Sequence, residues 1–329
     1  MRVLIVKLSS LGDVVHSLPA VQDIRAAFPG VQIDWAVEPA FAPLVRRVDG
    51  IGEVIECPLR RWRKAWWTGP VRAEWAKLRT RLQSVPYDAV IDLQGLTKSA
   101  WIARTAKGRS HGLANQTEGS SFEWPAGFLV DNAIKVEPRI HAMDRARVLV
   151  SKALGFELKG PPRYGLRAAR PTAQSTRPEK PTVAFVHGTS RDDKLWPQAQ
   201  WVSLGKRMIE AGWRIALPHG SEAEQTRAEM IGAALQFDRM NLVEVWPSLK
   251  LDAVVDRLAA TQGVVGVDSG LSHIAVALNL PHVQIYNFPT AWRTGPQAAH
   301  GNRDQLCVEA PGGPGLEPVW AAWLKVVDL

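Results

Sequence analysis

The chain opens with a short apolar run, a polar turn, and then apolar residues at helical spacing. Within residues 2–7, the four positions between Arg2 and Lys7 are all apolar, as in a parallel strand buried on both faces. After the polar, glycine-containing turn at 9–13, apolar residues recur every three to four positions, which predicts a helix that ends near Pro29-Gly30. The helical set is Val14, Leu18, Val21 and Ile24. With a further apolar run at 31–37, this pattern predicts a βαβ opening and an α/β sheet.

The same alternation continues along the chain, with one interruption. A strand is predicted at 89–92 and a helix at 98–106. Between 160 and 181 the pattern fails, because five prolines stand among polar residues, and this stretch is the best candidate for a domain linker. Beyond it, strands are predicted at 182–187, 214–217, 242–245, 263–267 and 283–286, and helices at 200–211, 222–235, 251–260 and 271–278.

These patterns predict two Rossmann-like α/β domains that face a cleft. We place the N-terminal domain at residues 1–170 and the C-terminal domain at 171–329, with the last helix a candidate for packing back on the N-terminal domain. The length of 329 residues is that of roughly two domains. In open parallel sheets, ligands bind at the carboxyl ends of the strands. The loops that follow the strands are therefore the places to look for chemistry.

Composition indicates an ordinary globular protein of the cytoplasm. Hydrophobic residues make up 46% of the chain and charged residues 22%. Cys57 and Cys307 form no disulfide framework or zinc pattern, so a reducing compartment is expected. The four apolar residues before Lys7 are too few for a signal peptide, and no apolar run approaches the ~18 residues of a membrane span.

The net charge of +8 is concentrated in one segment. Between 58 and 81 there are eight Lys and Arg residues against Glu74 alone, which leaves +7. Such a segment suits a polyanionic partner, namely nucleic acid, an anionic membrane or a phosphorylated glycolipid, although a solvated helix face is the alternative. Four tryptophans lie within it, and a mixture of aromatic and cationic side chains suits a membrane interface. They are Trp62, Trp66, Trp67 and Trp75.

The loop after the first predicted strand offers a carboxylate. Gly12 lets a ligand approach the backbone closely, and Asp13 follows at the start of a helix. A carboxylate at this position can take a proton from a hydroxyl nucleophile, but a first-turn aspartate that stabilises the helix start explains it equally simply. A single glycine falls short of the dinucleotide fingerprint, which disfavours a dehydrogenase on the same fold.

Three loops of the second half combine features of an anion or nucleotide site. Loop 187–197 contains Thr189, Ser190 and Lys194, whose hydroxyls and ammonium suit a diphosphate, although such loops are often only solvated. Residues 267–273 are predicted to form a strand end, an Asp-Ser-Gly turn and a helix start. The free N–H groups of the first helical turn can bind an anion, although an ordinary capped helix has the same sequence pattern. In loop 217–224 an acidic residue can accept the ribose hydroxyls of a nucleotide, although glutamates are common in a first helical turn.

Taken together, these motifs resemble those of the lipopolysaccharide heptosyltransferases, which are inverting enzymes of glycosyltransferase family 9 and have the two-Rossmann-domain (GT-B) fold. The resemblance runs from Met1 to about Tyr286. Its motifs are Arg2-Val3-Leu4-Ile5-Val6-Lys7 with Ser9-Ser10-Leu11-Gly12-Asp13, Thr189-Ser190-Arg191-Asp192-Asp193-Lys194 with Trp196-Pro197, and Asp268-Ser269-Gly270-Leu271-Ser272-His273. Arg60-Arg61-Trp62-Arg63-Lys64-Ala65-Trp66 is similar to the heptosyltransferase I branch, which adds the first heptose to Kdo-lipid A. Residues 287–293 lack a glycine expected early in that loop, so we assign no role there.

The resemblance implies a role for each motif residue. Asp13 would be the general base, and Lys194 would contact the donor's phosphate and assist catalysis. The donor, ADP-heptose, would be bound by Thr189, Ser190, Lys194, Glu224, Asp268, Ser269, Gly270, Leu271, Ser272 and His273. The acceptor, Kdo-lipid A, would be bound by Ser10, Gly12, Arg60, Arg63 and Lys64.

The resemblance also implies the reaction and where it takes place. Heptose would move with inversion from ADP-heptose to a Kdo hydroxyl, on an enzyme bound peripherally to the inner leaflet of the inner membrane. We expect no cofactor and no metal, because the chain has no Asp-x-Asp pair in position and Asp192-Asp193 are adjacent, so their side chains diverge. The alternatives are heptosyltransferase II, which acts on an already heptosylated core, and a basic nucleic-acid-binding protein. Segment 58–81 contains no recognisable nucleic-acid motif, so we expect no nucleic-acid partner.

Overall fold

The computed structural model describes residues 1–169, 180–236, 241–302 and 304–327. It divides into two compact units, Met1–Leu166 and Arg167–Leu329, which are treated separately below. The division lies close to the boundary expected at residue 170. Residues 170–179 of the expected linker lie outside the described residues.

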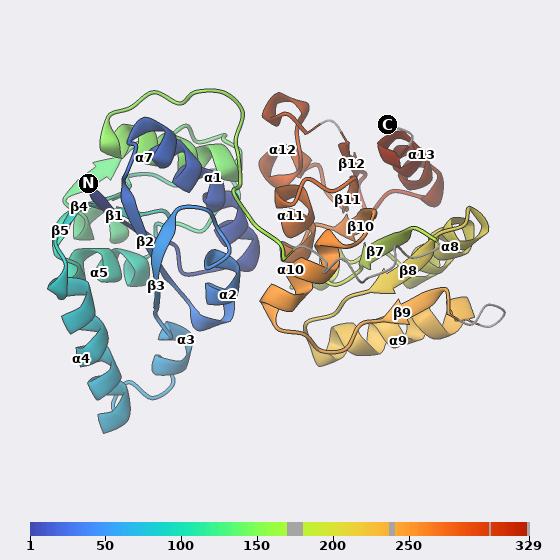
Figure 1. Cartoon of the computed structure of the whole chain (residues 1–329), viewed down its shortest axis with the longest axis horizontal. Coiled ribbons are helices and arrows are strands. Elements are labelled where there is room, and N and C mark those ends of the chain that lie inside the picture. Colours follow the sequence, from blue (N-terminus) through green and yellow to red (C-terminus); the bar gives the residue numbers. More distant parts are fainter. Residues whose placement is uncertain (170–179, 237–240, 303, 328–329) are drawn as a thin grey trace. The chain divides into compact units, whose positions relative to one another are not determined.

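The first unit is built on a parallel sheet in the order β3-β2-β1-β4-β5-β6 (Figure 1). Its strands are β1 (Arg2–Val6), β2 (Gln32–Val37), β3 (Ile51–Glu56), β4 (Tyr87–Asp92), β5 (Gly108–Leu113) and β6 (Asn132–Ile134). Its helices are α1 (Leu11–Ala27), α2 (Ala42–Val45), α3 (Leu59–Trp62), α4 (Gly69–Ser84), α5 (Thr97–Thr105), α6 (Ala126–Leu129) and α7 (Ala142–Leu154), with a 3-10 turn at Pro39–Phe41.

Alternation along β1 explains how this unit buries both faces of its sheet. Leu4 and Val6 join a core that includes Leu78 and Leu82 of α4 and Ile102 of α5. Helix α7 lies against β4, β5 and β6 and packs along α1. Residues of β1 therefore face helices on both sides, as the unbroken apolar run predicted.

The second unit repeats this arrangement with the order β12-β11-β10-β7-β8-β9, again parallel throughout (Figure 1). Its strands are β7 (Thr182–Val186), β8 (Arg214–Leu217), β9 (Val243–Val245), β10 (Gly263–Val267), β11 (His282–Tyr286) and β12 (Gln305–Glu309). Its helices are α8 (Gln198–Glu210), α9 (Glu222–Gln236), α10 (Leu251–Ala259), α11 (Gly270–Ala277), α12 (Ala291–Thr294) and α13 (Leu316–Val327), with 3-10 turns at Asp192–Lys194 and Ala298–His300.

The last helix belongs to the core of the second unit. Helix α13 packs on β11, β12 and α8, and its Trp323 is fully buried beside Val183 and Val283. A buried tryptophan on the inward face of a short helix stabilises this packing, because it removes a large apolar surface from water. That the last helix also packs back on the N-terminal domain stays a prediction.

Both sheets place their first strand beside their fourth, with the chain crossing to the other side between them. The switch points lie between β1 and β4 in the first unit and between β7 and β10 in the second. The expectation of two Rossmann-like α/β units is thereby confirmed, and the strand-end loops at these switch points are the places where such sheets bind ligands. In the described part of the chain, no helix is both long enough and apolar enough to span a membrane.

Candidate active site

In the first unit, Asp13 lies in the first turn of α1, directly after the end of β1. The hydroxyl of Ser10 donates to Asp13 Oδ2 at 2.7 Å, and the Ser10 N–H donates to the same oxygen at 3.2 Å. Asp13 therefore stabilises the start of α1, which is the structural role that the sequence offered as the alternative to a catalytic one. This leaves its other oxygen, Oδ1, turned toward two cations.

Those cations are Lys7 and Arg145. Lys7 Nζ lies 3.7 Å from Asp13 Oδ1, and an Arg145 guanidinium nitrogen lies 3.9 Å from the same atom. The Lys7 side chain is only 3% exposed, whereas that of Asp13 is 40% exposed. Asp13 thus presents an accessible carboxylate to a pocket of about 270 Å³. The pocket is lined by Lys7, Ser9, Ser10, Asp13, Gln94, Leu96, Ser120, Ser121 and Arg145.

The surroundings keep Asp13 ionised. Burial acts to raise its pKa, but the charge of Lys7, the hydrogen bonds from Ser10 and the charge of Arg145 outweigh it, so the pKa lies below its usual value. Burial lowers the pKa of Lys7, while the charge of Asp13 acts in the opposite direction. The geometry therefore favours a carboxylate that is ready to accept a proton at neutral pH.

Residues at the end of β4 fix the loop between β1 and α1, which leads to Asp13. The side-chain oxygen of Gln94, just after β4, accepts from the N–H groups of Leu8 at 2.7 Å and Ser9 at 3.3 Å. Asp92 at the end of β4 accepts from the Gln94 N–H at 2.9 Å and from the Ser99 hydroxyl at 2.9 Å. Burial raises the pKa of Asp92 to about 6. The β4 end thus fixes the backbone just before Ser10.

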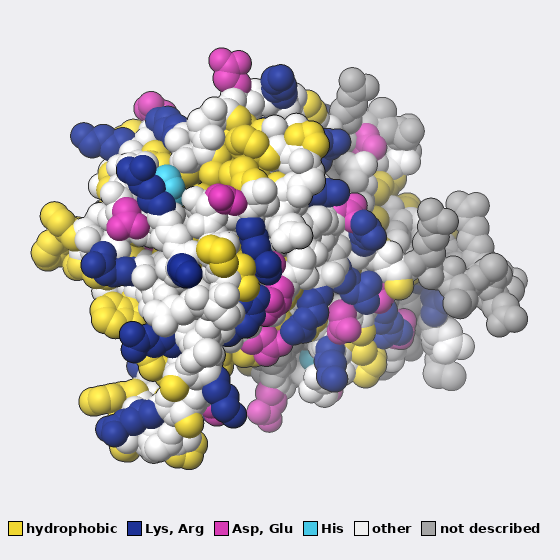
Figure 2. All heavy atoms as spheres, turned by 60° about the vertical axis from the view of Figure 1, so that its left-hand side comes forward, with side chains coloured by type: hydrophobic (Ala, Val, Ile, Leu, Met, Phe, Trp, Pro, Cys, Tyr) yellow, Lys and Arg dark blue, Asp and Glu magenta, His cyan; other side chains and the backbone are white. Residues whose placement is uncertain are grey.

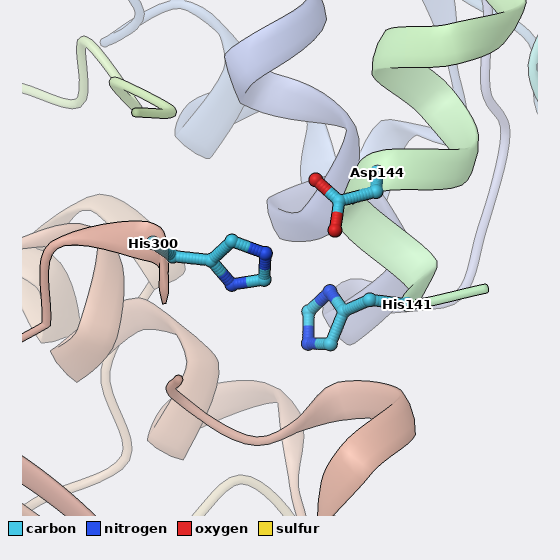
Figure 3. A group of neighbouring side chains, drawn as sticks. All are labelled: His141, Asp144 and His300. Carbon is cyan, nitrogen blue, oxygen red and sulfur yellow. The ribbon is translucent and has the colours of Figure 1, made fainter. Parts of the chain in front are cut away.

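Arg145 reaches the pocket from α7. Its guanidinium donates to the Thr117 hydroxyl at 2.8 Å, and its side chain is 10% exposed. His141 caps the helix, with its Nδ1 accepting from the Met143 N–H at 3.2 Å, and Asp144 follows in the first turn. Figure 3 shows the side chains of His141 and Asp144 at the start of this helix. Helix α7 therefore starts at a fixed position, which sets the place of Arg145.

In the second unit, Lys194 and Asp268 form a tight ion pair. Lys194 Nζ lies 2.6 Å from Asp268 Oδ2, and His273 Nε2 lies 3.4 Å from Oδ1. Burial acts to raise the pKa of Asp268, but the hydrogen bond and charge of His273, with those of Lys194, hold it well below its usual range. Asp268 is 7% exposed and Lys194 is 21% exposed, so the cation is the more accessible partner.

The start of α11 lies beside this pair. Ser269 precedes the helix, and its hydroxyl is buried with no hydrogen-bond partner among the described residues. The Ser272 hydroxyl donates to the Val267 carbonyl at 2.6 Å, so this hydroxyl is already engaged within the unit. Gly270 and Leu271 form the first turn and are partly exposed. Free N–H groups and an unbonded hydroxyl next to an ammonium are what an anion requires.

The predicted nucleotide loop adjoins the same strand ends. The Thr189 hydroxyl donates to the Asp268 carbonyl oxygen at 3.1 Å, and Ser190 is exposed. Glu224, in the first turn of α9, accepts from the Gly220 N–H at 2.7 Å. A Cβ at Gly188 would lie 2.5 Å from Glu224 Cδ, so only glycine allows this glutamate to approach the end of β7. The structure therefore brings Glu224 to the loop that contains Thr189.

The basic segment lies on and after α3, which follows β3. The Arg60 N–H donates to Glu38 Oε1 at 3.0 Å, while Arg63 and Lys64 are exposed. Arg61 is paired with Glu74, and the indole N–H of Trp62 donates to the same carboxylate at 2.7 Å. Trp62 is buried in the core, so it is not available as an interfacial anchor, whereas Trp66 and Trp67 are exposed.

Of the nine residues that line the first pocket, only Ser10 and Asp13 were predicted as site residues. Among the others, Lys7, Gln94 and Arg145 matter most, because they contact Asp13 or hold its loop. Lys7 offered a signal, since a lysine at the end of a buried strand needs a partner. Gln94 stands after a predicted strand, but its amide carries no chemistry of its own. Arg145 gave no local signal, because it reaches the pocket from a helix more than 100 residues along the chain.

Comparison with known proteins agrees with this geometry. The family model described as glycosyltransferase family 9 (heptosyltransferase) matches residues 75–311. The chain is 39% identical over 318 residues to lipopolysaccharide heptosyltransferase 1 of Escherichia coli O18:K1:H7, covering 95% of this chain and 92% of that one. Identity to lipopolysaccharide heptosyltransferase 2 of Escherichia coli K12 is 28%, covering 92% and 87%.

Solved structures show the same likeness. The structure of Escherichia coli heptosyltransferase WaaC with ADP has a TM-score of 0.83 at 36% identity, and the one with ADP-2-deoxy-2-fluoro heptose has 0.79 at 37%. Each covers 95% of this chain and 94% of the other. The chain therefore belongs to glycosyltransferase family 9, the heptosyltransferases, and is a glycosyltransferase with two Rossmann-like units of the GT-B type.

Proposed function

We propose that this protein transfers heptose from ADP-heptose to a Kdo hydroxyl of Kdo-lipid A, with inversion at the anomeric carbon. The observation that carries the proposal is the accessible Asp13 carboxylate, whose Oδ1 faces the buried Lys7. The names of the relatives support the donor and the acceptor, since WaaC was solved with ADP and with an ADP-heptose analogue, and relatives at 38–40% identity are of the heptosyltransferase 1 type.

The proposed step moves one proton and exchanges one bond. Asp13 accepts the proton of the acceptor hydroxyl as its oxygen forms a bond to the anomeric carbon of heptose. The bond between that carbon and the diphosphate oxygen breaks on the opposite face, and ADP leaves with the bonding electrons. Lys194 and the N–H groups at the start of α11 stabilise the charge that gathers on the leaving diphosphate.

The donor is assigned to the second unit. The buried, unbonded hydroxyl of Ser269 and the accessible ammonium of Lys194 fit a diphosphate, and Glu224 fits the ribose hydroxyls. Asp268 contributes through Lys194, since a carboxylate does not bind phosphate directly. With these groups present the reaction needs no metal ion and no cofactor.

The acceptor and the membrane are assigned to the first unit. Arg60, Arg63 and Lys64 form the acceptor patch, which would meet the phosphates and carboxylates of the glycolipid at the cytoplasmic face of the inner membrane. Each cation near an anionic surface contributes about 1 kcal/mol, and the field decays over ~8 Å at physiological salt. Changing all three to Ser is expected to raise the acceptor KM and weaken binding to anionic vesicles, with the donor KM unchanged. If the variant and the wild type have equal acceptor KM and equal vesicle binding, the patch has no binding role and is only a solvated surface.

The decisive experiment for the whole proposal is a transfer assay. Purified protein is incubated with ADP-heptose and Kdo-lipid A, and the product masses are recorded. We expect the mass of one added heptose. A parallel reaction offers the already heptosylated acceptor, and transfer to that acceptor alone would assign the protein to the heptosyltransferase 2 reaction instead.

A further inference from the structure

A groove lies between α4 and α5 in the first unit, apart from the pocket at Asp13. It holds about 290 Å³. Its walls combine two tryptophans, two arginines and two polar side chains: Trp75, Arg79, Gln83, Trp101, Arg104 and Thr105. Two arginines and two tryptophans that line one groove provide a site for an anionic group attached to an apolar body.

The charge around the groove is strongly positive. Residues 58–109 contain twelve Lys and Arg residues and three acidic residues, so this segment carries +9, more than the net +8 of the whole chain. The three acids are occupied, since Asp92 is buried, Glu74 binds Arg61, and Asp88 accepts from the Arg2 N–H. Among the described residues, neither Arg79 nor Arg104 forms an ion pair.

Exposed aromatic side chains extend from the groove onto α6. Trp101 is 54% exposed, Trp124 is 71% exposed and Phe128 is 78% exposed. Trp124 and Phe128 pack edge to face with ring centroids 5.6 Å apart. Arg104 connects this cluster to the groove, because its guanidinium lines the groove and also donates to the Leu129 carbonyl at 3.4 Å. Large aromatics exposed together mark an interaction surface.

The same composition recurs at the connection between α3 and α4. Trp66 and Trp67 are 65% and 59% exposed. Figure 2 shows hydrophobic and Lys or Arg side chains next to one another on the part of the first unit that projects at the bottom of the view, where Figure 1 places this connection. Aromatic rings beside cations are typical of the boundary between water and lipid.

We propose that the face formed by α4, α5 and α6 binds the surface of an anionic lipid bilayer. Arg79 and Arg104 hold the phosphate of one lipid in the groove, while Trp101, Trp124 and Phe128 lie at the headgroup level. The inference extends the proposed membrane attachment at the acceptor patch, but it is independent of heptosyl transfer. A lipid is favoured over a nucleic acid because two exposed rings, Trp124 just before α6 and Phe128 on it, lie outside the set of residues that line the groove. There they can lie at the headgroup level of a bilayer while the guanidinium groups hold a phosphate.

The test is co-sedimentation with vesicles of phosphatidylglycerol and phosphatidylcholine, and with phosphatidylcholine alone, across a salt series. The double variant Arg79→Ser/Arg104→Ser is expected to bind anionic vesicles roughly 30-fold more weakly, at about fivefold per cation. The charge-matched control is Lys206→Ser/Lys325→Ser, two exposed lysines of the second unit, which should bind as the wild type does. All four residues are exposed, and thermal unfolding verifies that both variants fold.

A second variant tests the aromatic part. Trp101→Phe/Trp124→Phe should keep vesicle binding while losing part of the fluorescence quenching by lipids with brominated acyl chains. Unchanged sedimentation of the arginine variant would overturn the groove assignment, and unchanged quenching of the tryptophan variant would overturn the aromatic one. Single-stranded DNA that displaces the wild type from vesicles at physiological salt would indicate a nucleic-acid surface instead. Vesicle binding without heptosyl transfer would refute the proposed function while leaving this surface in place.

Discussion

The two units share one strand order but bury opposite charges at their switch points. In the first, the cation Lys7 is 3% exposed and its partner Asp13 is 40% exposed. In the second, the carboxylate Asp268 is 7% exposed and its partner Lys194 is 21% exposed. Each site therefore presents to its ligand the charge that the other site hides. The same strand order thus presents a carboxylate that can take a proton in one unit and an ammonium that can bind an anion in the other.

The difference shows how burial divides the work within an ion pair. The buried partner is fixed by the sheet and by further hydrogen bonds, such as that of Lys7 with the Leu93 carbonyl at 3.2 Å. The accessible partner is then oriented by it, and in the first unit the charge of Lys7 also helps to lower the pKa of Asp13. In the proposed reaction, the accessible member of each pair contacts the substrate, and the buried member acts through it. Substitutions of the two members should therefore have different effects.

The largest effect is expected from removing the accessible carboxylate. Asp13→Asn should lower kcat ~10²–10⁴-fold, since the amide cannot accept the proton, while its oxygen can still accept from Ser10. Steady-state kinetics with both substrates measure this, and ADP-heptose affinity by calorimetry serves as the control. A folded variant with near wild-type kcat would remove Asp13 from the chemistry.

Removing the accessible cation should have the next largest effect. Lys194→Ala is expected to weaken ADP-heptose binding and slow transfer together, each by roughly 10–100-fold, as for the loss of a charged hydrogen bond. The matched control is Arg191→Ala, an exposed cation of the same loop that pairs with Asp193, which should have little effect. A Lys194 variant altered only in acceptor KM would place the nucleotide in the other unit.

Removing the buried cation should shift the pH profile. Lys7 helps to lower the pKa of Asp13, and a base works only when deprotonated, so the wild-type rate persists down to acidic pH. In Lys7→Met the Asp13 pKa rises, and the acidic limb of kcat/KM should move to higher pH. An unmoved limb would show that Lys7 does not control the ionisation of Asp13.

The smallest effect is expected from chelation. If Lys194 and the start of α11 serve the leaving diphosphate, EDTA should leave the transfer rate unchanged. The measurement is the rate before and after dialysis against EDTA. Loss of activity that magnesium or manganese restores would show that the second unit needs a metal ion to stabilise the leaving group.

Sequence patterns predicted the strands and helices whose apolar residues follow a clear run or a helical spacing. The unbroken apolar run of β1 and the helical spacing of α1 are of this kind. Strand β5, Gly108–Leu113, was not predicted, because its glycines, serine and histidine have low strand preference and only pairing with β4 makes it a strand. Strand β12 was missed for a similar reason, since it completes the sheet only beside β11.

The candidate site divides in the same way. Asp13 and Lys194 stand in recognisable loops, so their positions could be predicted. Their surroundings could not be: the Arg145 contact to Asp13 and the Lys194 contact to Asp268 join residues far apart in the chain. Only the strand order brings such residues together, and no local spacing encodes it.

The ion pair between Lys194 and Asp268 has a consequence for inhibitor chemistry. Because a carboxylate already lies 2.6 Å from the ammonium, the site is much closer to electrical neutrality than an isolated lysine would make it. An incoming diphosphate therefore gains less from charge alone and more from the directed N–H groups. Uncharged linkers that accept hydrogen bonds should replace the diphosphate in an analogue at a smaller loss of affinity than a bare cationic site would impose.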